Sequence, residues 1–177
     1  MSNQNDPNTH YDEADIPSLI EKARDLRRVD ELEDSQQLLL DLLKEFPEHP
    51  LILFEVGGSY DVLGEEEMAI PYYREAVENG LTGEDRHECL ICLGSSLRVM
   101  GEDEEAIEVL ESAVDEFPHH NSARVFLALA YYSNDQPDQA ISELLALLLE
   151  TTADEDILAY ADVLEYYKDN LDEEMGE

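Results

Sequence analysis

The chain has 177 residues, which is enough for one domain with a hydrophobic core. Its 45 acidic and 10 basic residues give a formal net charge of −35, so it is not expected to bind nucleic acid or an anionic membrane surface, which would repel it. No apolar run approaches the roughly 18 residues of a membrane-spanning helix. The polar, acidic N-terminus is not typical of a signal peptide, so a cytoplasmic location is expected.

Both ends of the chain are predicted to lie outside the folded domain. Residues 1–15 are rich in Asn, Asp and Pro without apolar periodicity, so we expect a disordered arm, and residues 170–177 form an acidic tail. Between them, apolar residues recur at helical spacing and Gly or Pro separates the segments. This pattern predicts nine helices: Pro17–Val29, Leu32–Glu45, Pro50–Leu63, one that opens at Glu65, Asp85–Val99, Asp103–Glu116, Ser122–Ser133, Pro137–Glu150 and Glu155–Asp169.

Glycines have two predicted roles in these helices. Gly64 and Gly101 follow helices at the place of a left-handed cap. Gly57 and Gly58 lie inside a helix, where each glycine costs about 1 kcal/mol relative to Ala. Close approach of a partner helix would explain Gly57, but it does not explain Gly58. The acidic runs that follow Gly64 and Gly101 suit the positive end of a helix dipole, and they lack the order of Asp and Gly that an EF-hand calcium site requires.

Small residues recur along the chain with one period. In the first helix of each predicted pair they are Ala23, Gly57, Gly94 and Ala128, with gaps of 34, 37 and 34 residues. In the second helices they are Ser35, Ala69, Ala106 and Ala140, with the same gaps. The segment ends Pro47, Leu81, Pro118 and Thr152 repeat the series again. Agreement of three markers argues against chance and places a three-residue insertion near Thr82–Arg86.

The period and the residue order resemble the tetratricopeptide pattern W-x2-L-G-x2-Y, A-x3-F, P. The second repeat fits best, with Val56-Gly57-x2-Tyr60 followed by Ala69-x3-Tyr73. The resemblance covers about Ile16 to Asp154, although the tryptophan is absent and its places hold Leu19, Leu53, Leu90 and Arg124. The run Gly80–Arg86, followed by Leu93–Arg98, is similar to group 5, a small bacterial group of stand-alone tetratricopeptide proteins.

This resemblance implies an all-α fold, a right-handed α-α superhelix (solenoid) of about four helix pairs. The folded domain would span residues 16–169. Its repeats would lie at about 16–49, 50–86, 87–120 and 121–154, and a capping helix would follow at 155–169.

The resemblance also implies a function. In this family the first helices of each pair line a concave groove, which binds an extended peptide or a helix. We therefore predict a non-catalytic module for protein–protein interaction, with a partner of open identity. The predicted groove residues are Ile20, Arg24, Arg27, Arg28, Phe54, Gly58, Asp61, Ile91, Ser95, Arg98, Val125, Leu129 and Tyr132.

The cations on the first predicted helix have two interpretations. Arg24, Arg27 and Arg28 are three of only seven arginines, and with Arg98 they can form a site for a partner carboxylate. They can instead pair with nearby acids, which are Glu21, Asp25 and Glu31.

The last predicted helix favours a second function. One apolar stripe, Ile157, Ala161 and Leu164, can cover Leu144, Leu145 and Leu148. A second stripe, Tyr160, Val163 and Tyr167, would face solvent in a monomer. The alternative function is therefore a self-associating scaffold, most simply a homodimer.

We find no pattern typical of an enzyme, a metal site or a cofactor site. Cys89 and Cys92 lie in a helix, whereas a redox pair needs a helix N-terminus beside a sheet. A zinc site would need two more ligands, and only His87 is near. We interpret the cysteines as packed thiols. No Gly-rich phosphate loop or spaced nucleophile and base is present, so no catalysis and no cofactor are predicted.

Overall fold

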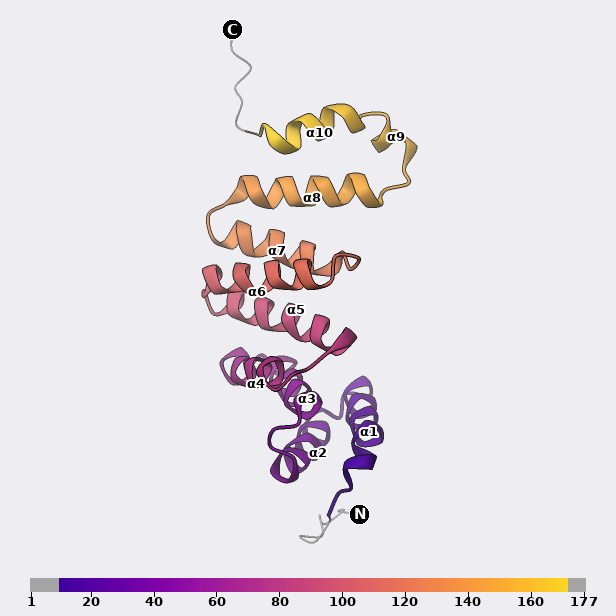
Figure 1. Cartoon of the computed structure of the whole chain (residues 1–177), viewed down its shortest axis with the longest axis vertical. Coiled ribbons are helices and arrows are strands. Elements are labelled where there is room, and N and C mark those ends of the chain that lie inside the picture. The colour runs from indigo at the N-terminus through magenta and orange to yellow at the C-terminus, as the bar shows by residue number, and fades with distance from the viewer. Residues whose placement is uncertain (1–9, 172–177) are drawn as a thin grey trace. The chain divides into compact units, whose positions relative to one another are not determined.

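The computed structural model describes residues 10–171 (Figure 1). In this range every regular element is a helix, which confirms the prediction of an all-α fold built from consecutive helix pairs. The chain forms two compact units, Met1–Cys89 and Leu90–Glu177, and one helix passes from the first unit into the second.

The first unit contains a short 3-10 helix and two complete helix pairs. Its elements are η1 (Glu13–Asp15), α1 (Ile16–Arg28), α2 (Leu32–Glu45), α3 (Pro50–Asp61), α4 (Glu66–Glu78) and the first part of α5 (Gly83–Val99). Helix α2 packs against α1 and α3, and α4 packs against α3 (Figure 1). The core between α1, α2 and α3 consists of Ile16, Ile20, Ala23, Leu39, Leu42, Ile52 and Val56.

The second unit continues the same arrangement. Its elements are the rest of α5, α6 (Asp103–Glu116), α7 (Ser122–Ser133), α8 (Pro137–Thr151), α9 (Glu155–Leu158) and α10 (Ala161–Asp169). Helix α7 packs between α6 and α8, and α10 packs against the other side of α8 (Figure 1).

A residue with a left-handed backbone ends the first helix of every repeat. These residues are Asp30, Gly64, Gly101 and Asp135, with φ of 66°, 73°, 80° and 53°. In each turn the next residue donates its N–H to the carbonyl five positions back, which closes a Schellman motif. The gaps between the four residues are 34, 37 and 34. They confirm the predicted period with a marker that does not depend on the small residues.

The three-residue insertion lengthens a helix and does not enlarge a loop. Helix α5 has 17 residues, whereas α3 and α7, the equivalent helices of the neighbouring repeats, have 12 each. The extra length lies at the N-terminal end, because α5 begins 11 residues before its marker Gly94, whereas α3 begins seven residues before Gly57. The start of α5 at Gly83 is two residues before the predicted start at Asp85.

Small residues permit close packing within the helix pairs, as predicted. A Cβ at Gly57 would lie 2.7 Å from ring carbons of Tyr73, and a Cβ at Gly94 would lie 2.5 Å from Cγ of Leu110. In the first repeat the two small residues touch directly, because the Ser35 hydroxyl donates to the Ala23 carbonyl at 2.8 Å. All eight marker residues are buried.

Arg124 stands in the fourth repeat where the tetratricopeptide pattern has a tryptophan, and ion pairs stabilise its side chain there. Its side chain is mostly buried and forms ion pairs with Glu143 and Glu150 of α8. A cation on α7 therefore packs against the second helix of its pair through two carboxylates of that helix.

The predicted capping helix 155–169 is wrong in one respect, because it is two helices. The Asp154 side chain caps α9 by accepting the N–H groups of Asp156 and Ile157. At the end of α9 the Tyr160 N–H donates to the Ile157 carbonyl, three residues back, which tightens the last turn. The Tyr160 carbonyl then begins α10.

The predicted disordered arm is wrong for residues 10–15. Asp12 caps η1 by accepting the Ala14 N–H, and the Tyr11 N–H donates to the Glu45 carboxylate at 2.9 Å. Tyr11 also packs against the core of the first unit. Residues 1–9 of the arm and residues 172–177 of the acidic tail lie outside the described part of the chain.

Candidate functional site

Six of the seven groove residues predicted in the first unit line one hollow. They are Arg24, Arg27 and Arg28 of α1 and Phe54, Gly58 and Asp61 of α3. The hollow has a volume of about 530 Å³, and Glu55, Val62 and Glu88 complete its lining. Phe54 is 5 % exposed and supplies the apolar floor.

Ile20, the seventh residue, is not a groove wall. Its side chain is 1 % exposed and belongs to the core beneath α1. This correction follows from the helical period, because Ile20 lies four residues from Ile16 and three from Ala23, on the face that packs against α2.

The hollow is organised around Glu55, a residue that the sequence analysis missed. Glu55 is 3 % exposed, and its two carboxylate oxygens accept from different arginines. Arg24 Nε donates to one oxygen at 2.7 Å, and Arg27 donates to the other. A signal was available, because Glu55 is the only ionisable residue between Pro50 and Tyr60, and a buried carboxylate in an apolar helix needs a cation.

Further carboxylates surround the arginines of α1. Arg24 also contacts Glu21 at 2.9 Å and Asp85 at 3.1 Å, and Arg28 contacts Asp25 at 2.5 Å. Burial lowers the pKa of Arg24, but the charge of Glu55 and the hydrogen bonds to its three acids outweigh this effect and raise it. All three arginines therefore already have carboxylate partners within the chain.

Gly58 gives Arg27 the space to reach Glu55. A Cβ at Gly58 would lie 3.0 Å from Nη1 of Arg27. The second glycine of the Gly57–Gly58 pair thus accommodates a side chain, whereas the first accommodates the partner helix. Asp61, one turn further along, accepts the Tyr73 hydroxyl at 3.0 Å.

The groove residues predicted on α7 form an exposed apolar stripe. Val125, Leu129 and Tyr132, hereafter the α7 stripe, are 39 %, 42 % and 68 % exposed. Their spacing of four and three residues places them on one face of the helix. On α5, Ile91, Ser95 and Arg98 are partly buried.

Arg98 differs from the other cations of its unit. Its Nη1 lies 3.5 Å from the Ser133 hydroxyl, and its Nε is buried without a hydrogen-bond partner among the described residues. Arg124 pairs with two glutamates, and Lys168 pairs with Glu165 at 2.6 Å. Arg98 is the one cation in the described part of this unit that has no carboxylate partner.

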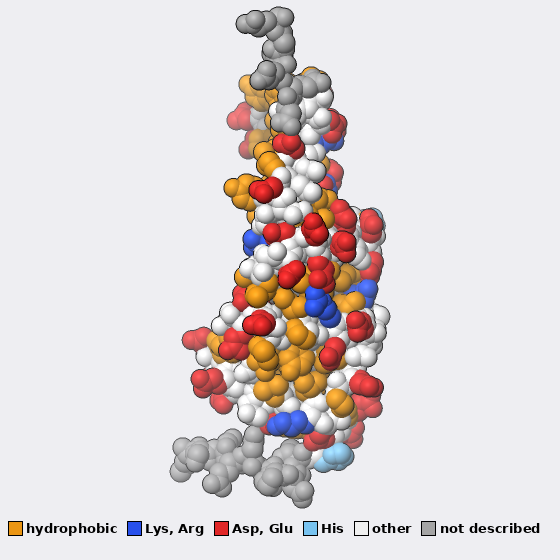
Figure 2. All heavy atoms as spheres, turned by 90° about the vertical axis from the view of Figure 1, so that its left-hand side faces the viewer, with side chains coloured by type: hydrophobic (Ala, Val, Ile, Leu, Met, Phe, Trp, Pro, Cys, Tyr) orange, Lys and Arg blue, Asp and Glu red, His pale blue; other side chains and the backbone are white. Residues whose placement is uncertain are grey.

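Acidic side chains dominate the surface. Residues 90–177 contain 22 acidic and three basic residues, a formal balance of −19. Figure 2 shows one face of the molecule, on which Asp and Glu are spread among the hydrophobic side chains and Lys and Arg are few.

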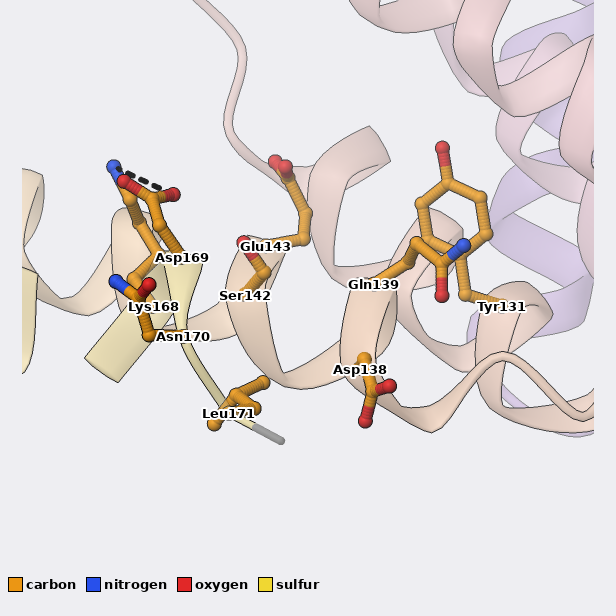
Figure 3. A pocket seen from close by; sticks show the side chains of 9 residues that line it. All are labelled: Tyr131, Asp138, Gln139, Ser142, Glu143, Lys168, Asp169, Asn170 and Leu171. Carbon is orange, nitrogen blue, oxygen red and sulfur yellow. Dashed lines mark ion pairs between the residues drawn. The ribbon is translucent and has the colours of Figure 1, made fainter. Parts of the chain in front are cut away.

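A polar pocket of about 660 Å³ lies where α7, α8 and the end of α10 meet (Figure 3). Its lining consists of Tyr131, Asp138, Gln139, Ser142, Glu143, Lys168, Asp169, Asn170 and Leu171. The Tyr131 hydroxyl donates to Glu111 at 2.8 Å. Burial, together with this hydrogen bond and the charges of Glu111 and Glu143, raises the pKa of Tyr131 to about 12.

The two cysteines of the chain do not form a disulfide with each other. Cys89 is buried, with Sγ 3.6 Å from the Tyr73 carbonyl oxygen, and Cys92 is partly buried. Burial of Cys89 agrees with the interpretation as a packed thiol.

Comparison with known families identifies the repeat. A family model described as "Tetratrico peptide repeat" (TPR_5) matches residues 50–164, which is well over half of the chain. The chain belongs to the tetratricopeptide repeat (TPR) family. The match begins at the second repeat of this TPR protein, and the first repeat lies outside the matched segment. Comparison with curated proteins gave no match.

Solved structures share the fold of this TPR protein. One is YrrB, described as a TPR protein with an unusual peptide-binding site, at a TM-score of 0.66, 21 % identity, and coverage of 87 % of this chain and 78 % of that chain. A second is a putative kinesin light chain with TPR-like repeats from Podosopora anserina, at a TM-score of 0.69 and 19 % identity, with coverage of 92 % of this chain and 93 % of that chain. A third is MamA from Desulfovibrio magneticus, at a TM-score of 0.64 and 17 % identity, with coverage of 87 % of this chain and 85 % of that chain.

Within residues 10–171 no helix of this TPR protein combines the length and the apolar character required to cross a membrane.

Proposed function

We propose that this TPR protein is a non-catalytic interaction module that binds a peptide or helical segment of a protein partner along the first helices of its pairs. The observation that carries the proposal is the α7 stripe. Its three residues are among those that the family resemblance implies for the groove, and each is an apolar side chain exposed by more than a third. A row of apolar side chains at helical spacing suits the apolar face of a partner segment better than a small molecule.

The hollow of the first unit is a second surface included in the proposal. Arg28 is the arginine best placed to meet a partner there, because its side chain is 64 % exposed and its contacts are surface ion pairs with Asp25 and Glu21. Arg24 and Arg27 support the hollow from within through Glu55. YrrB, which shares this fold and is described as having a peptide-binding site, gives general support to a peptide ligand.

Peptide binding by single-residue variants tests this function. The full chain is applied to an array of short synthetic peptides with mixed apolar and basic composition. Leu129→Glu, which puts a charge into the α7 stripe, is expected to abolish binding. Ile141→Glu on α8 is the matched control, because Ile141 is 45 % exposed and lies outside the stripe. Equal loss in both variants, or no loss in either, contradicts the proposal.

A homodimer is the second candidate function. Tyr160, Val163 and Tyr167, the stripe predicted to face solvent, are 66 %, 42 % and 46 % exposed, and Tyr166 beside them is 50 % exposed. The outer face of a terminal repeat is ordinarily polar, because it has no further neighbour. An apolar outer face on α10 therefore supports contact with a second copy.

Light scattering tests self-association. Asp162 and Glu165 are exposed on the same helix as Val163 and Tyr167. In a dimer the acids of the two copies would repel each other, so association is expected to strengthen when salt screens their charges. Val163→Asp is expected to give a monomer at every salt concentration. A wild-type chain that stays monomeric at high salt and high protein concentration contradicts the homodimer.

The proposal places the module in the cytoplasm, where the thiols of Cys89 and Cys92 would stay reduced. The formal charge of −35 supports protein segments, and not nucleic acid or anionic membrane, as ligands.

A further inference from the structure

Arg98 is a partly buried side chain with a buried Nε, in a unit rich in acidic acceptors. Its Nε has no partner among the described residues, and its hydrogen bond to Ser133, at 3.5 Å, is at the limit of a hydrogen-bond length. A guanidinium carries five N–H donors in a rigid fork that matches a carboxylate. None of the 22 acidic residues in its half of the sequence is paired with it among those the structure describes.

Lys22 shows why this is unusual. Lys22 also lacks a described ion pair, but it is exposed on α1, where water satisfies its ammonium group. Arg98 is partly buried, and water cannot reach its Nε in this structure. Buried polar groups are ordinarily hydrogen-bonded, so an arginine without a carboxylate at this partly buried position is an exception that needs an explanation.

The position of Arg98 connects it to the α7 stripe. Its hydrogen-bond acceptor Ser133 lies four residues after Leu129 and next to Tyr132, at the end of α7. The guanidinium therefore lies at one end of the exposed apolar stripe. An apolar surface with an unpaired cation at its end is complementary to an apolar segment that carries one negative charge.

We propose that Arg98 binds a single carboxylate of the partner segment whose apolar side chains cover the α7 stripe. This inference rests on the proposed function and names the chemistry of its ligand. The segment has no net negative charge, because the balance of −19 over residues 90–177 repels a segment with several carboxylates. The carboxylate is that of an Asp or Glu side chain within the segment.

Arg24 and Arg27 do not compete for this role, because they share the buried Glu55. Arg28 forms surface ion pairs with Asp25 and Glu21 and lies in the hollow of the first unit, away from the α7 stripe in the sequence. Of the four arginines that the sequence suggested for a partner carboxylate, Arg98 is the one assigned to the segment on the α7 stripe.

Paired peptides test the proposal. The probes are short, N-acetylated and C-amidated peptides of apolar and lysine residues, made as twins that differ only by Asp or Asn at one position. A third set carries Asn and a free C-terminus. The full-length wild type is expected to bind Asp peptides about ten-fold more tightly than their neutral twins and than the peptides with a free C-terminus. Preference for the set with a free C-terminus would overturn the assignment to a side chain.

Two variants assign the preference to Arg98. Arg98→Gln is expected to bind both twins with equal affinity, whereas Lys22→Gln, which removes the same charge from an exposed position, keeps the preference. The Nε–H signal of Arg98 in the wild type, followed by NMR, is expected to shift with the charged peptide and not with its neutral twin. This signal tests the proposal without any substitution.

The outcomes distinguish failure of the Arg98 role from failure of the groove function. Wild type that binds both twins equally, with loss of binding in Leu129→Glu, overturns the role of Arg98 and leaves the groove function standing. Wild type that binds no peptide of any set overturns both. A preference that persists in Arg98→Gln also overturns the role of Arg98.

Discussion

The guanidinium of Arg27 lies over Gly58, with Nη1 only 3.0 Å from the position that a Cβ on that glycine would occupy. A glycine in the middle of a helix costs about 1 kcal/mol relative to alanine. In α3 this cost is offset by the contact it permits, since Arg27 crosses Gly58 to reach the buried Glu55. The two residues come from different repeats, so the helix pairs of the first unit are joined by charge as well as by the apolar core.

The first prediction concerns this pair. Gly58→Ala is expected to leave the free energy of unfolding of wild type almost unchanged, because the gain in helix propensity is offset by displacement of Arg27. In an Arg27→Ala background the same substitution is expected to stabilise the chain by about 1 kcal/mol. Urea unfolding of the two single variants and the double variant measures the coupling. Additive effects would mean that Gly58 is unrelated to Arg27.

The neighbouring glycine provides the control. Gly57→Ala is expected to destabilise the chain by about 1–3 kcal/mol in either background, because its Cβ would meet the Tyr73 ring at 2.7 Å and the core would be overpacked.

The second prediction concerns Glu55. Glu55→Gln removes the charge that faces Arg24 and Arg27. Breaking a fully buried ion pair costs about 3–5 kcal/mol, and partial exposure of both arginines lowers the expected loss here to roughly 1–3 kcal/mol. Chemical unfolding measures it. Glu21→Gln, which removes an exposed partner of Arg24, is the control and is expected to cost less than about 0.5 kcal/mol.

The third prediction concerns the turns. Asp30 and Asp135 hold the left-handed position that glycine holds in the second and third repeats. Asp135→Gly is expected to stabilise the chain by about 0.5–1 kcal/mol, because a side chain is strained at that φ. Thermal unfolding checks the sign. A lower midpoint for Asp135→Gly would contradict the assignment, and Gly101→Ala, the reverse change, is expected to destabilise.

The fourth prediction concerns alkaline pH. The pKa of Tyr131 is about 12 in the folded chain and 10.0 in the reference state, so the unfolded phenol loses its proton first. The stability that this phenol contributes is complete below pH 10 and is lost as the pH rises towards 12. Tyr131→Phe is therefore expected to lose stability less steeply than wild type in this window. Parallel curves of unfolding free energy against pH would contradict the raised pKa.

Much of the fold followed from the sequence because the repeat is periodic. Small residues at fixed positions defined the helix pairs, and the left-handed turns reproduced the gaps of 34, 37 and 34. Helix ends without a Gly or Pro, and contacts distant in sequence, were not predictable from this period. The interruption at Tyr160 depends on a tightened last turn, and the order of residues 10–15 depends on Glu45, a residue distant in sequence.

The candidate site was predicted less completely. The resemblance placed Val125, Leu129 and Tyr132 on what is an exposed face of α7, but it did not tell the core residue Ile20 from a groove residue. The ion-pair partners of the arginines were harder to predict from the sequence. The sequence offered Glu21, Asp25 and Glu31 to the arginines of α1, whereas the main acceptor is Glu55 in the next repeat. Contacts of this kind depend on how two repeats stack, which a single repeat does not encode.

The most direct test of partner binding is to map where a peptide binds. A peptide selected by the wild-type chain is titrated into the isotope-labelled protein, and the backbone amide signals are followed by NMR. Shifts concentrated on α7 around Leu129 and Tyr132, and absent in Leu129→Glu, are the predicted result. Shifts confined to α10 around Val163, or unchanged binding by Leu129→Glu, would contradict it.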